Sequence, residues 1–336
     1  MTGSQTNPPQ EPDRDTQGKS WGKVSGSTTV YLGIIVLLGF APPFLSLINE
    51  PFYLDLLSRM LILGIAALSL NLILGYGGMI SMGHAAYLGI GAYCVGIPAY
   101  YEIYNGFVHL ALAIVLSGIF AFLSGIISLR TKGVYFIMIT LAFTQMLYFT
   151  FVSLEEYGGD DGLVIELRSE FPGLFDTENN TNLYYCIYLT LLGSLLLVHR
   201  LIQAPFGRVI IGSKHNEERM RSLGYNTYRY RLVCYVISGI LCGIAGVFLG
   251  NFTSFISPEM MDWTHSGELI FMIVIGGVNS LFGPLIGSML FIFFEEWLSG
   301  ITVYWHFIFG LMLIALVLFG KGGINGLITA LFGERR

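Results

Sequence analysis

Residues 75–84 read GYGGMISMGH, a glycine-rich stretch between two apolar runs. The run before it, residues 53–74, is long enough to cross a bilayer as a helix, and a second apolar run starts directly after it. Glycine weakens a helix, and a histidine is costly in hydrocarbon unless protein or water surrounds it. The stretch therefore predicts a broken membrane helix, which is tolerated only where protein or a water-filled cavity covers the free backbone groups.

The composition places the whole chain in the membrane class. Of its 336 residues, 54% are hydrophobic and 12% are charged, whereas a soluble domain carries roughly 25% charged residues. The formal net charge of −5 argues against a nucleic acid partner. The four cysteines form no CxxC pair, so we expect small buried apolar residues and no metal site. We predict an all-α, polytopic bundle of membrane helices, some of them broken.

About ten apolar runs have the length of a membrane segment or of a half-helix. They lie at 29–48, 53–74, 84–101, 107–129, 133–153, 183–203, 229–251, 264–276, 284–298 and 302–320. Lys and Arg collect in the cytoplasmic connections of membrane proteins. Here they collect at 130–132, 200–231 and 321–336, while the connection at 154–182 is acidic. This asymmetry predicts that both termini are cytoplasmic and that the acidic connection is outside.

The two ends of the chain differ from the apolar region between them. Residues 1–27 are rich in Gly, Ser, Thr, Pro and charge, so we expect a disordered cytoplasmic tail. Residues 28–320 hold the membrane segments. Residues 321–336 are expected to form a second cytoplasmic tail.

A second break is predicted in the last third of the chain. The run at 264–276 corresponds to about 20 Å of helix, which is shorter than a hydrocarbon core of roughly 30 Å. It ends in GGVNSLFGP at 276–284, where Pro284 suits the first turn of a new helix. Both breaks share the pattern Gly-Gly, two residues, Ser, one or two apolar residues, and then Gly. Because 53–74 is already full length, we expect the first break to lie nearer the cytoplasmic face than the second.

Breaks of this kind expose backbone groups beside the substrate path of transporters. We therefore predict that residues of the two breaks border the path: Gly77, Gly78, Ser81, His84, Gly276, Gly277, Asn279, Ser280 and Gly283. For His84, hydrogen bonding to loop carbonyls is the open alternative.

Several other residues have structural expectations. His265 and Glu268 lie about one helical turn apart, and we expect them to pair, with substrate contact as the alternative. Glu295 and Glu296 are expected to be solvated at an outer helix end. One helix carries small residues at four-residue spacing that are expected to let helices approach closely: Ser238, Cys242, Gly246 and Gly250.

The basic connection at 207–231 reads GRVIIGSKHNEERMRSLGYNTYRYR. Asn216 can cap a short helix whose charges oppose the helix dipole in the favourable sense. Gly224 suits the left-handed residue that ends such a helix. The segment is either a solvated connector, held inside by its charge, or a docking helix for a cytoplasmic partner. The docking residues would be Asn216, Glu217, Glu218, Arg219, Arg221 and Gly224.

Three ordered blocks of the chain resemble the LivM-type permeases of branched-chain amino acid ABC importers. The blocks are NLILGYGGMISMGHAAYLGIGAY at 71–93, GRVIIGSKHNEERMRSLGYNTYRYRLVCYVISGILCGIAGVFLG at 207–250 and SPEMMDWTHSGELIFMIVIGGVNSLFGPLIGSML at 257–290. The resemblance covers roughly residues 50–320. It implies an ABC importer permease domain over 28–320 with a cytoplasmic coupling loop at 205–228.

The resemblance implies a transport subunit that works with partners, and not an enzyme. The partners are a second homologous permease, two cytoplasmic ATPases that bind ATP and Mg, an extracytoplasmic substrate-binding protein and the lipid bilayer of a bacterial or archaeal cytoplasmic membrane. No cofactor is implied for this chain, which also lacks the G-xxxx-GK-[ST] nucleotide motif. Glu218 and Gly224 keep the spacing of the E-A-A-xxx-G importer loop, whereas Arg219 and Met220 replace its two alanines.

The implied substrates are branched-chain or other hydrophobic amino acids. Importers of urea and short amides use similar permeases, so they stay open as the alternative. An ion-coupled secondary transporter needs charged residues near the midplane to carry its ion, and the sequence offers few. A membrane redox subunit would need histidine pairs spaced for haem, which are not evident.

Overall fold

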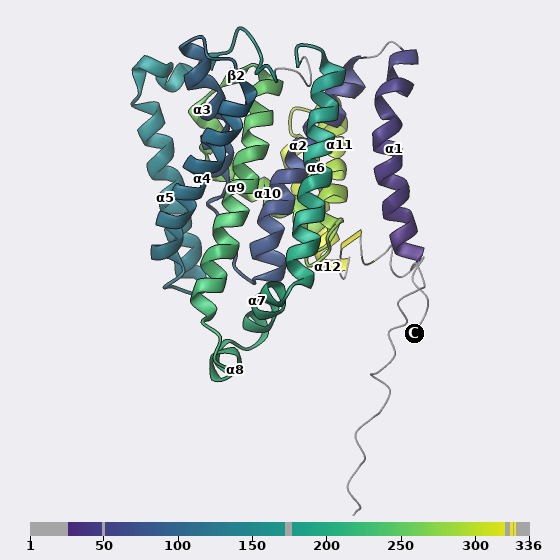
Figure 1. Ribbon diagram of the computed structural model, residues 1–336. Coiled ribbons are helices and arrows are strands. Elements are labelled where there is room, and N and C mark those ends of the chain that lie inside the picture. The colour runs from purple at the N-terminus through teal and green to yellow at the C-terminus, as the bar shows by residue number, and fades with distance from the viewer. Residues whose placement is uncertain (1–25, 49–50, 172–176, 320–322, 325, 327–336) are drawn as a thin grey trace, which may run out of the picture.

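The computed structural model describes residues 26–48, 51–171, 177–319, 323–324 and 326 (Figure 1). Within these residues the chain is a bundle of helices with one two-stranded sheet. The tails predicted at 1–27 and 321–336 lie almost wholly outside the described residues. At the first of them, helix α1 already begins at Gly26.

Every run predicted as a membrane segment coincides with a helix. In chain order these helices are α1 (Gly26–Ile48), α2 (Pro51–Asn71), α3 (His84–Tyr100), α4 (Gly106–Ser128), α5 (Val134–Val152), α6 (Asn180–Gln203), α9 (Thr227–Thr253), α10 (Trp263–Gly276), α11 (Gly283–Ser299) and α12 (Trp305–Phe319). The other elements are η1 (Leu72–Tyr76), a π-helical turn that extends α2, the 3-10 turns η2 (Glu155–Tyr157), η3 (Gly159–Asp161) and η4 (Pro258–Met261), strands β1 (Leu163–Val164) and β2 (Phe255–Ile256), and helices α7 (Pro205–His215) and α8 (Glu217–Ser222). The predicted helical bundle is confirmed.

Three helices beside the predicted breaks are shorter than the helices that can cross a membrane. Five described helices are long and apolar enough to cross a membrane: Phe52–Tyr76, Gly106–Ser128, Val134–Val152, Asn180–Gln203 and Thr227–Thr253. Helices α3, α10 and α11, which flank the two breaks, have only 17, 14 and 17 residues.

Helix α9 packs closely against α3 through its small residues. A Cβ on Gly246 would overlap the carbonyl oxygen of Leu88, and a Cβ on Gly91 would lie 2.9 Å from the Cα of Gly246. Ser238 and Cys242 of the same helix are fully buried. The packing role predicted for these small residues is confirmed.

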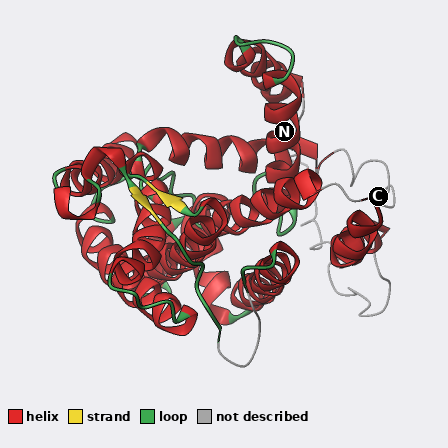
Figure 2. Cartoon of the chain, turned by 90° about the horizontal axis from the view of Figure 1, so that it is seen from above, coloured by secondary structure: helices red, strands yellow, loops and turns green. Residues whose placement is uncertain are grey.

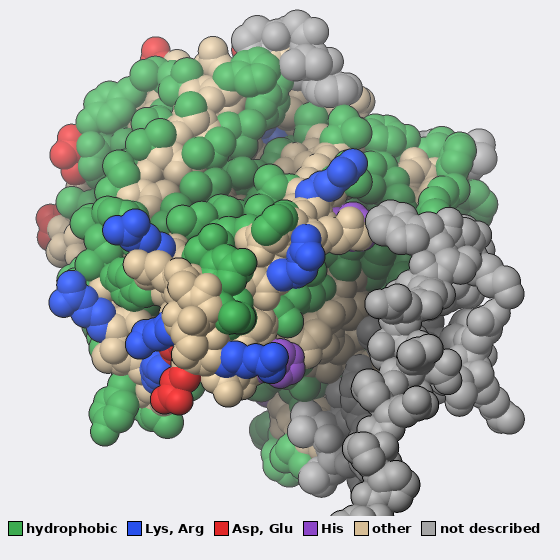
Figure 3. All heavy atoms as spheres, turned by 60° about the horizontal axis from the view of Figure 1, so that its bottom comes forward, with side chains coloured by type: hydrophobic (Ala, Val, Ile, Leu, Met, Phe, Trp, Pro, Cys, Tyr) green, Lys and Arg blue, Asp and Glu red, His purple; other side chains and the backbone are tan. Residues whose placement is uncertain are grey.

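The two ends of the bundle differ in charge. At one end, here named the basic end, α7 and α8 project beyond the other helices, and Lys and Arg side chains gather there (Figures 1 and 3). The α4–α5 connection also lies at this end, since its Lys132 forms an ion pair with Glu217 of α8 at 2.5 Å. At the other end, the acidic end, β1 of the acidic connection pairs antiparallel with β2, as Figure 2 shows from above.

Helix α10 starts in the middle of the bundle and not at its edge. Gln145, near the middle of α5, donates a hydrogen bond to Oδ1 of Asp262, the residue before α10 (3.1 Å). The N–H of Ala85, at the start of α3, donates to Oγ of Ser266 in α10 (2.9 Å). Because α10 starts halfway, its 14 residues suffice to reach the basic end.

Candidate functional site

The two glycine breaks meet at the basic end of the bundle. Asn71 Nδ2, at the end of α2, donates a hydrogen bond to the carbonyl oxygen of Ser280 in the second break (2.8 Å). A Cβ on Gly75 would lie 3.1 Å from the backbone nitrogen of Asn279. The expectation that the first break lies nearer the cytoplasmic face than the second is therefore wrong. The shorter helix α10 ends level with α2 because it starts halfway down the bundle.

The shared pattern of the two breaks corresponds to a shared backbone geometry. The second glycine of each pair has a positive φ, +69° at Gly78 and +111° at Gly277, which favours glycine. In each break the serine accepts a hydrogen bond from a backbone N–H of a later glycine. That glycine precedes α3 in the first break and is the first residue of α11 in the second. The N–H of Gly83 donates to Ser81 Oγ (3.1 Å), and the N–H of Gly283 donates to Ser280 Oγ (3.1 Å).

One side chain from the basic end ties the two breaks together. Lys214, near the end of α7, donates from Nζ to the carbonyl oxygen of Gly75 (2.6 Å) and to Asn279 Oδ1 (2.9 Å). Its aliphatic stem lies over Gly78, where a Cβ would come 2.8 Å from Lys214 Cγ. Asn279 has a positive φ of +68°, a strained position that its contact with Lys214 helps to hold. We name Lys214, Gly75 and Asn279 the lysine clasp.

The remaining predicted path residues lie at close backbone contacts. A Cβ on Gly276 would overlap the carbonyl oxygen of Gly283, and a Cβ on Gly77 would lie 2.6 Å from the carbonyl oxygen of Ile73. These glycines let α10 approach α11 and let the chain turn after α2. The clasp thus brings Gly78 and Asn279 of the two breaks together.

His84 lies apart from the clasp, fully buried between α3 and α9. Ser238 Oγ donates to the carbonyl oxygen of Ser69 (2.5 Å), so the 2.8 Å contact between Ser238 and His84 has Nε2 of His84 as the donor. The Nδ1 of His84 then lacks its proton, and no partner for it occurs among the described residues. From the sequence alone, hydrogen bonding of His84 to loop carbonyls stayed open as an alternative. In the structure its side chain instead hydrogen-bonds to Ser238, a residue of helix α9.

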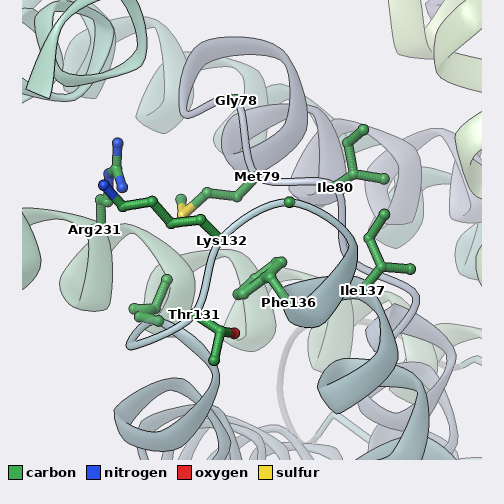
Figure 4. Close-up of a pocket in the computed structure, with 10 residues that line it drawn as sticks. Gly78, Met79, Ile80, Thr131, Lys132, Phe136, Ile137 and Arg231 are labelled. Atoms are coloured by element: carbon green, nitrogen blue, oxygen red, sulfur yellow. The ribbon is translucent and has the colours of Figure 1, made fainter.

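A pocket of about 180 Å³ lies between the first break and the α4–α5 connection (Figure 4). Ile80 and Ile137 lie at one side of it, and Lys132 and Arg231 lie at the other. Lys132 and Arg231 are adjacent because both pair with Glu217 Oε2, at 2.5 and 3.3 Å. The pocket therefore connects the backbone of the first break to the charged residues around α8.

The segment expected as a coupling loop at 205–228 contains two helices. Pro205 occupies the first turn of α7, where its missing N–H is harmless, and this helix was not predicted. The shorter α8 begins as predicted, because Asn216 Oδ1 accepts the N–H of Arg219 (2.9 Å). Gly224 follows it with a φ of +89°, also as predicted.

Glu217 anchors α8 to two other parts of the basic end, the α4–α5 connection and α9, and also pairs within α8. Its carboxylate pairs with Lys132, with Arg221 (2.6 Å) and with Arg231 (3.3 Å). Burial raises the pKa of Glu217, but hydrogen bonding to Lys132 and the charges of Arg231 and Arg221 outweigh burial and hold that pKa below its usual range. Glu217 is therefore ionised at neutral pH and fixes the position of α8.

The neighbouring residues of α8 face away from the bundle. Glu218 and Arg219 are exposed, and no hydrogen bond of the Glu218 side chain occurs among the described residues. Leu223 and Tyr225, just after the helix, are 65% and 43% exposed. Exposed apolar side chains at a projecting tip, beside charged ones, are suited to contact with another protein.

A larger cavity of about 440 Å³ lies closer to the acidic end, between α2, α3, α9, α10 and η4. We name it the α2–α10 cavity. Its walls carry charged side chains from three elements, Arg59, Glu259, His265 and Glu268, and several Leu and Met side chains.

Two pairs of polar side chains lie at this cavity. His265 Nδ1 and Glu268 Oε2 are 3.0 Å apart, so their predicted pairing is confirmed. Arg59 pairs with Glu295 at 2.9 Å. The expectation that Glu295 is solvated is therefore wrong, because its side chain is only 19% exposed and faces α2.

Sequence reasoning missed Asn71 and Lys214 at the two breaks, and Arg59 at the α2–α10 cavity. Asn71 is a fully buried amide within an apolar helix, and a polar residue at such a position is itself a signal of function. Lys214 carried no separate signal, because it is one of many cations in its connection. The membrane topology already explained the positive charge of that connection.

Comparison with known proteins agrees with this architecture. The family described as "Branched-chain amino acid transport system / permease component" matches residues 52–317. One relative is the high-affinity branched-chain amino acid transport system permease protein LivM of Salmonella typhimurium. It is 25% identical over 327 residues, which cover 90% of this chain and 76% of that protein. The LivM protein of Escherichia coli K12 gives the same values. A probable LivM protein of Methanocaldococcus jannaschii is 25% identical over 270 residues, covering 68% and 76%. No solved structure matches the chain.

Proposed function

The chain belongs to the family of branched-chain amino acid transport permeases, and we propose that its substrates are branched-chain or other hydrophobic amino acids. It is a permease subunit of an ABC importer and a transport protein, not an enzyme. We infer that it lines the translocation path together with a second, homologous permease. An extracytoplasmic binding protein delivers the substrate, and two cytoplasmic ATPases hold ATP and Mg.

The observation that carries the proposal is the meeting of the two breaks at the lysine clasp. Helix breaks place backbone and small polar groups beside the substrate path of transporters. Gly77, Gly78, Ser81, Gly276, Gly277, Asn279, Ser280 and Gly283 border this path in the proposal, and His84 supports it from between α3 and α9. The clasp connects these residues to α7, which leads directly into α8.

The proposed coupling element is α8 with its flanking residues, Asn216, Glu217, Glu218, Arg219, Arg221 and Gly224. The exposed Glu218, Arg219, Leu223 and Tyr225 contact the ATPase. Movement of α8 then follows two routes into the membrane segments. Glu217 passes it to α9 through Arg231 and to the α4–α5 connection through Lys132. Lys214 passes it to both breaks.

Uptake into vesicles tests the proposed function. The permeases and ATPases are reconstituted, the binding protein is supplied with leucine, and a proton uncoupler is present throughout. We expect leucine uptake that requires ATP and does not respond to the uncoupler. Uptake that the uncoupler abolishes would point instead to an ion-coupled transporter, and ATP-driven uptake of urea but not leucine would reassign the substrate class.

We further propose that the basic end is cytoplasmic, with both chain termini on that side of the inner membrane. The charge difference between the two ends supports this orientation. New cysteines are introduced one at a time, by Glu166→Cys in the acidic connection and by Leu223→Cys after α8, and labelling is compared with the parent protein. An impermeant thiol reagent is expected to label the first in intact cells and the second only after permeabilisation. Labelling of both from one side contradicts the orientation.

A further inference from the structure

The α2–α10 cavity combines charges of both signs with an apolar wall. Arg59 comes from α2, while His265 and Glu268 come from α10. Leu249 of α9 and Leu269 of α10 contribute to the apolar part. Small-molecule sites are cavities of about 300–1,000 Å³ with mostly apolar walls and a few placed polar groups. The volume of about 440 Å³ and the mixed lining agree with such a site.

Arg59 retains donors that can bind an anion. Its ion pair with Glu295 engages Nη2, and a guanidinium group has five N–H donors. Among the residues that the structure describes, its side chain makes no other hydrogen bond, and it is 37% exposed. A carboxylate group matches the fork of a guanidinium group in two parallel hydrogen bonds.

Glu268 presents an acceptor for a cation in the same cavity. Its Oε2 contacts His265, whereas for Oε1 the described part of the chain supplies no hydrogen bond. The Glu268 side chain is 41% exposed. Glu259 of η4 adds a second carboxylate to the lining. An ammonium group has three donors and no acceptor, so it requires such oxygens when it leaves water.

We propose that Arg59 and Glu268 bind the carboxylate and the ammonium of an amino acid zwitterion, with the leucines of the cavity against its aliphatic side chain. This assignment rests on the proposed function and gives the permease a substrate site of its own, separate from the breaks. A zwitterion inside the bundle must replace the hydration of both charges. Urea and neutral amides carry neither charge and would use neither group.

Three variants of the reconstituted complex test the assignment. Arg59→Gln and Glu268→Gln are expected to lower the initial rate of leucine uptake at least about tenfold each, because each removes hydrogen bonds to a charged group. Saturating binding protein keeps delivery from limiting the rate. Glu295→Gln is the matched control, since it breaks the same ion pair but leaves Arg59 in place, and it is expected to retain uptake. Basal ATP hydrolysis and co-purification of the ATPases should be unchanged in all three.

A second measurement tests directly whether substrate occupies the cavity, and it does not depend on these variants. Leu249→Cys places a thiol in the cavity wall, and excess leucine is expected to slow its labelling. Leucinamide, which lacks the carboxylate, and 4-methyl-2-oxopentanoate, which lacks the ammonium, should each protect it less. Equal protection by all three compounds, or none by leucine, overturns the assignment.

The outcomes separate this assignment from the proposed function. If Glu295→Gln loses as much uptake as Arg59→Gln, the ion pair is structural and the assignment fails. If Arg59→Gln and Glu268→Gln import leucine at the parent rate, the assignment fails while the proposed function stands. If the parent complex imports no leucine, both fail.

Discussion

Replacing Lys214 by methionine is expected to lower amino acid uptake strongly while the assembled complex still hydrolyses ATP. Methionine keeps much of the aliphatic stem that lies over Gly78, but it donates no hydrogen bond to Gly75 or Asn279. Hydrogen bonds from a charged donor contribute about 1.5–3 kcal/mol each, so the two breaks lose their connection to α7. We expect uptake to fall at least about tenfold, measured beside the ATPase rate of the same preparation.

Arg208→Met is the matched control for this experiment. Arg208 is exposed on the same helix, and its side chain makes no hydrogen bond within the described part of the chain. The control removes the same charge from the same helix and should retain uptake. Equal loss in both variants would assign the effect to the charge of α7, and unchanged uptake in Lys214→Met would exclude the clasp from coupling.

Charge reversal at Glu218 is expected to disconnect the ATPases. The side chain is exposed on α8 and makes no hydrogen bond or ion pair within the described residues, so Glu218→Arg should leave the fold of the basic end intact. A like-charge contact at an interface costs several kcal/mol, which weakens association on the order of a hundredfold or more. The measurements are co-purification of the ATPases and the stimulation of ATP hydrolysis by loaded binding protein.

Glu166→Arg provides the comparison, because Glu166 is exposed in the acidic connection at the opposite end. That reversal changes the net charge equally and should leave co-purification unchanged. If Glu218→Arg also behaves like the parent protein, α8 does not dock the ATPase, and the segment is the solvated connector that the sequence left open.

The membrane segments were predictable because each depends on a local property of the chain. An apolar run of sufficient length must form its backbone hydrogen bonds internally in a bilayer, so it becomes a helix whatever its neighbours are. The same holds for the cap at Asn216 and the left-handed Gly224, which depend on residues within one turn. Helix α7 was missed because its basic residues were attributed to topology.

The contacts of the candidate sites were not predictable, because they join distant parts of the chain. Lys214 and Gly75 are 139 positions apart, and Arg59 and Glu295 are 236 positions apart. No pattern within either segment indicates the other. Glu295 reads as a solvated residue at a helix end until α2 is placed beside it.

By itself the sequence determined that this chain is a bundle of membrane helices, where two of them break, and which end carries the basic connections. These properties follow from hydropathy, glycine content and charge along the chain. Only the tertiary structure decided that α10 starts halfway down the bundle and that the two breaks therefore meet at Lys214. The depth of a helix is set by its side-chain contacts with neighbouring helices, here Gln145 with Asp262 and Ala85 with Ser266, and not by its own length or composition.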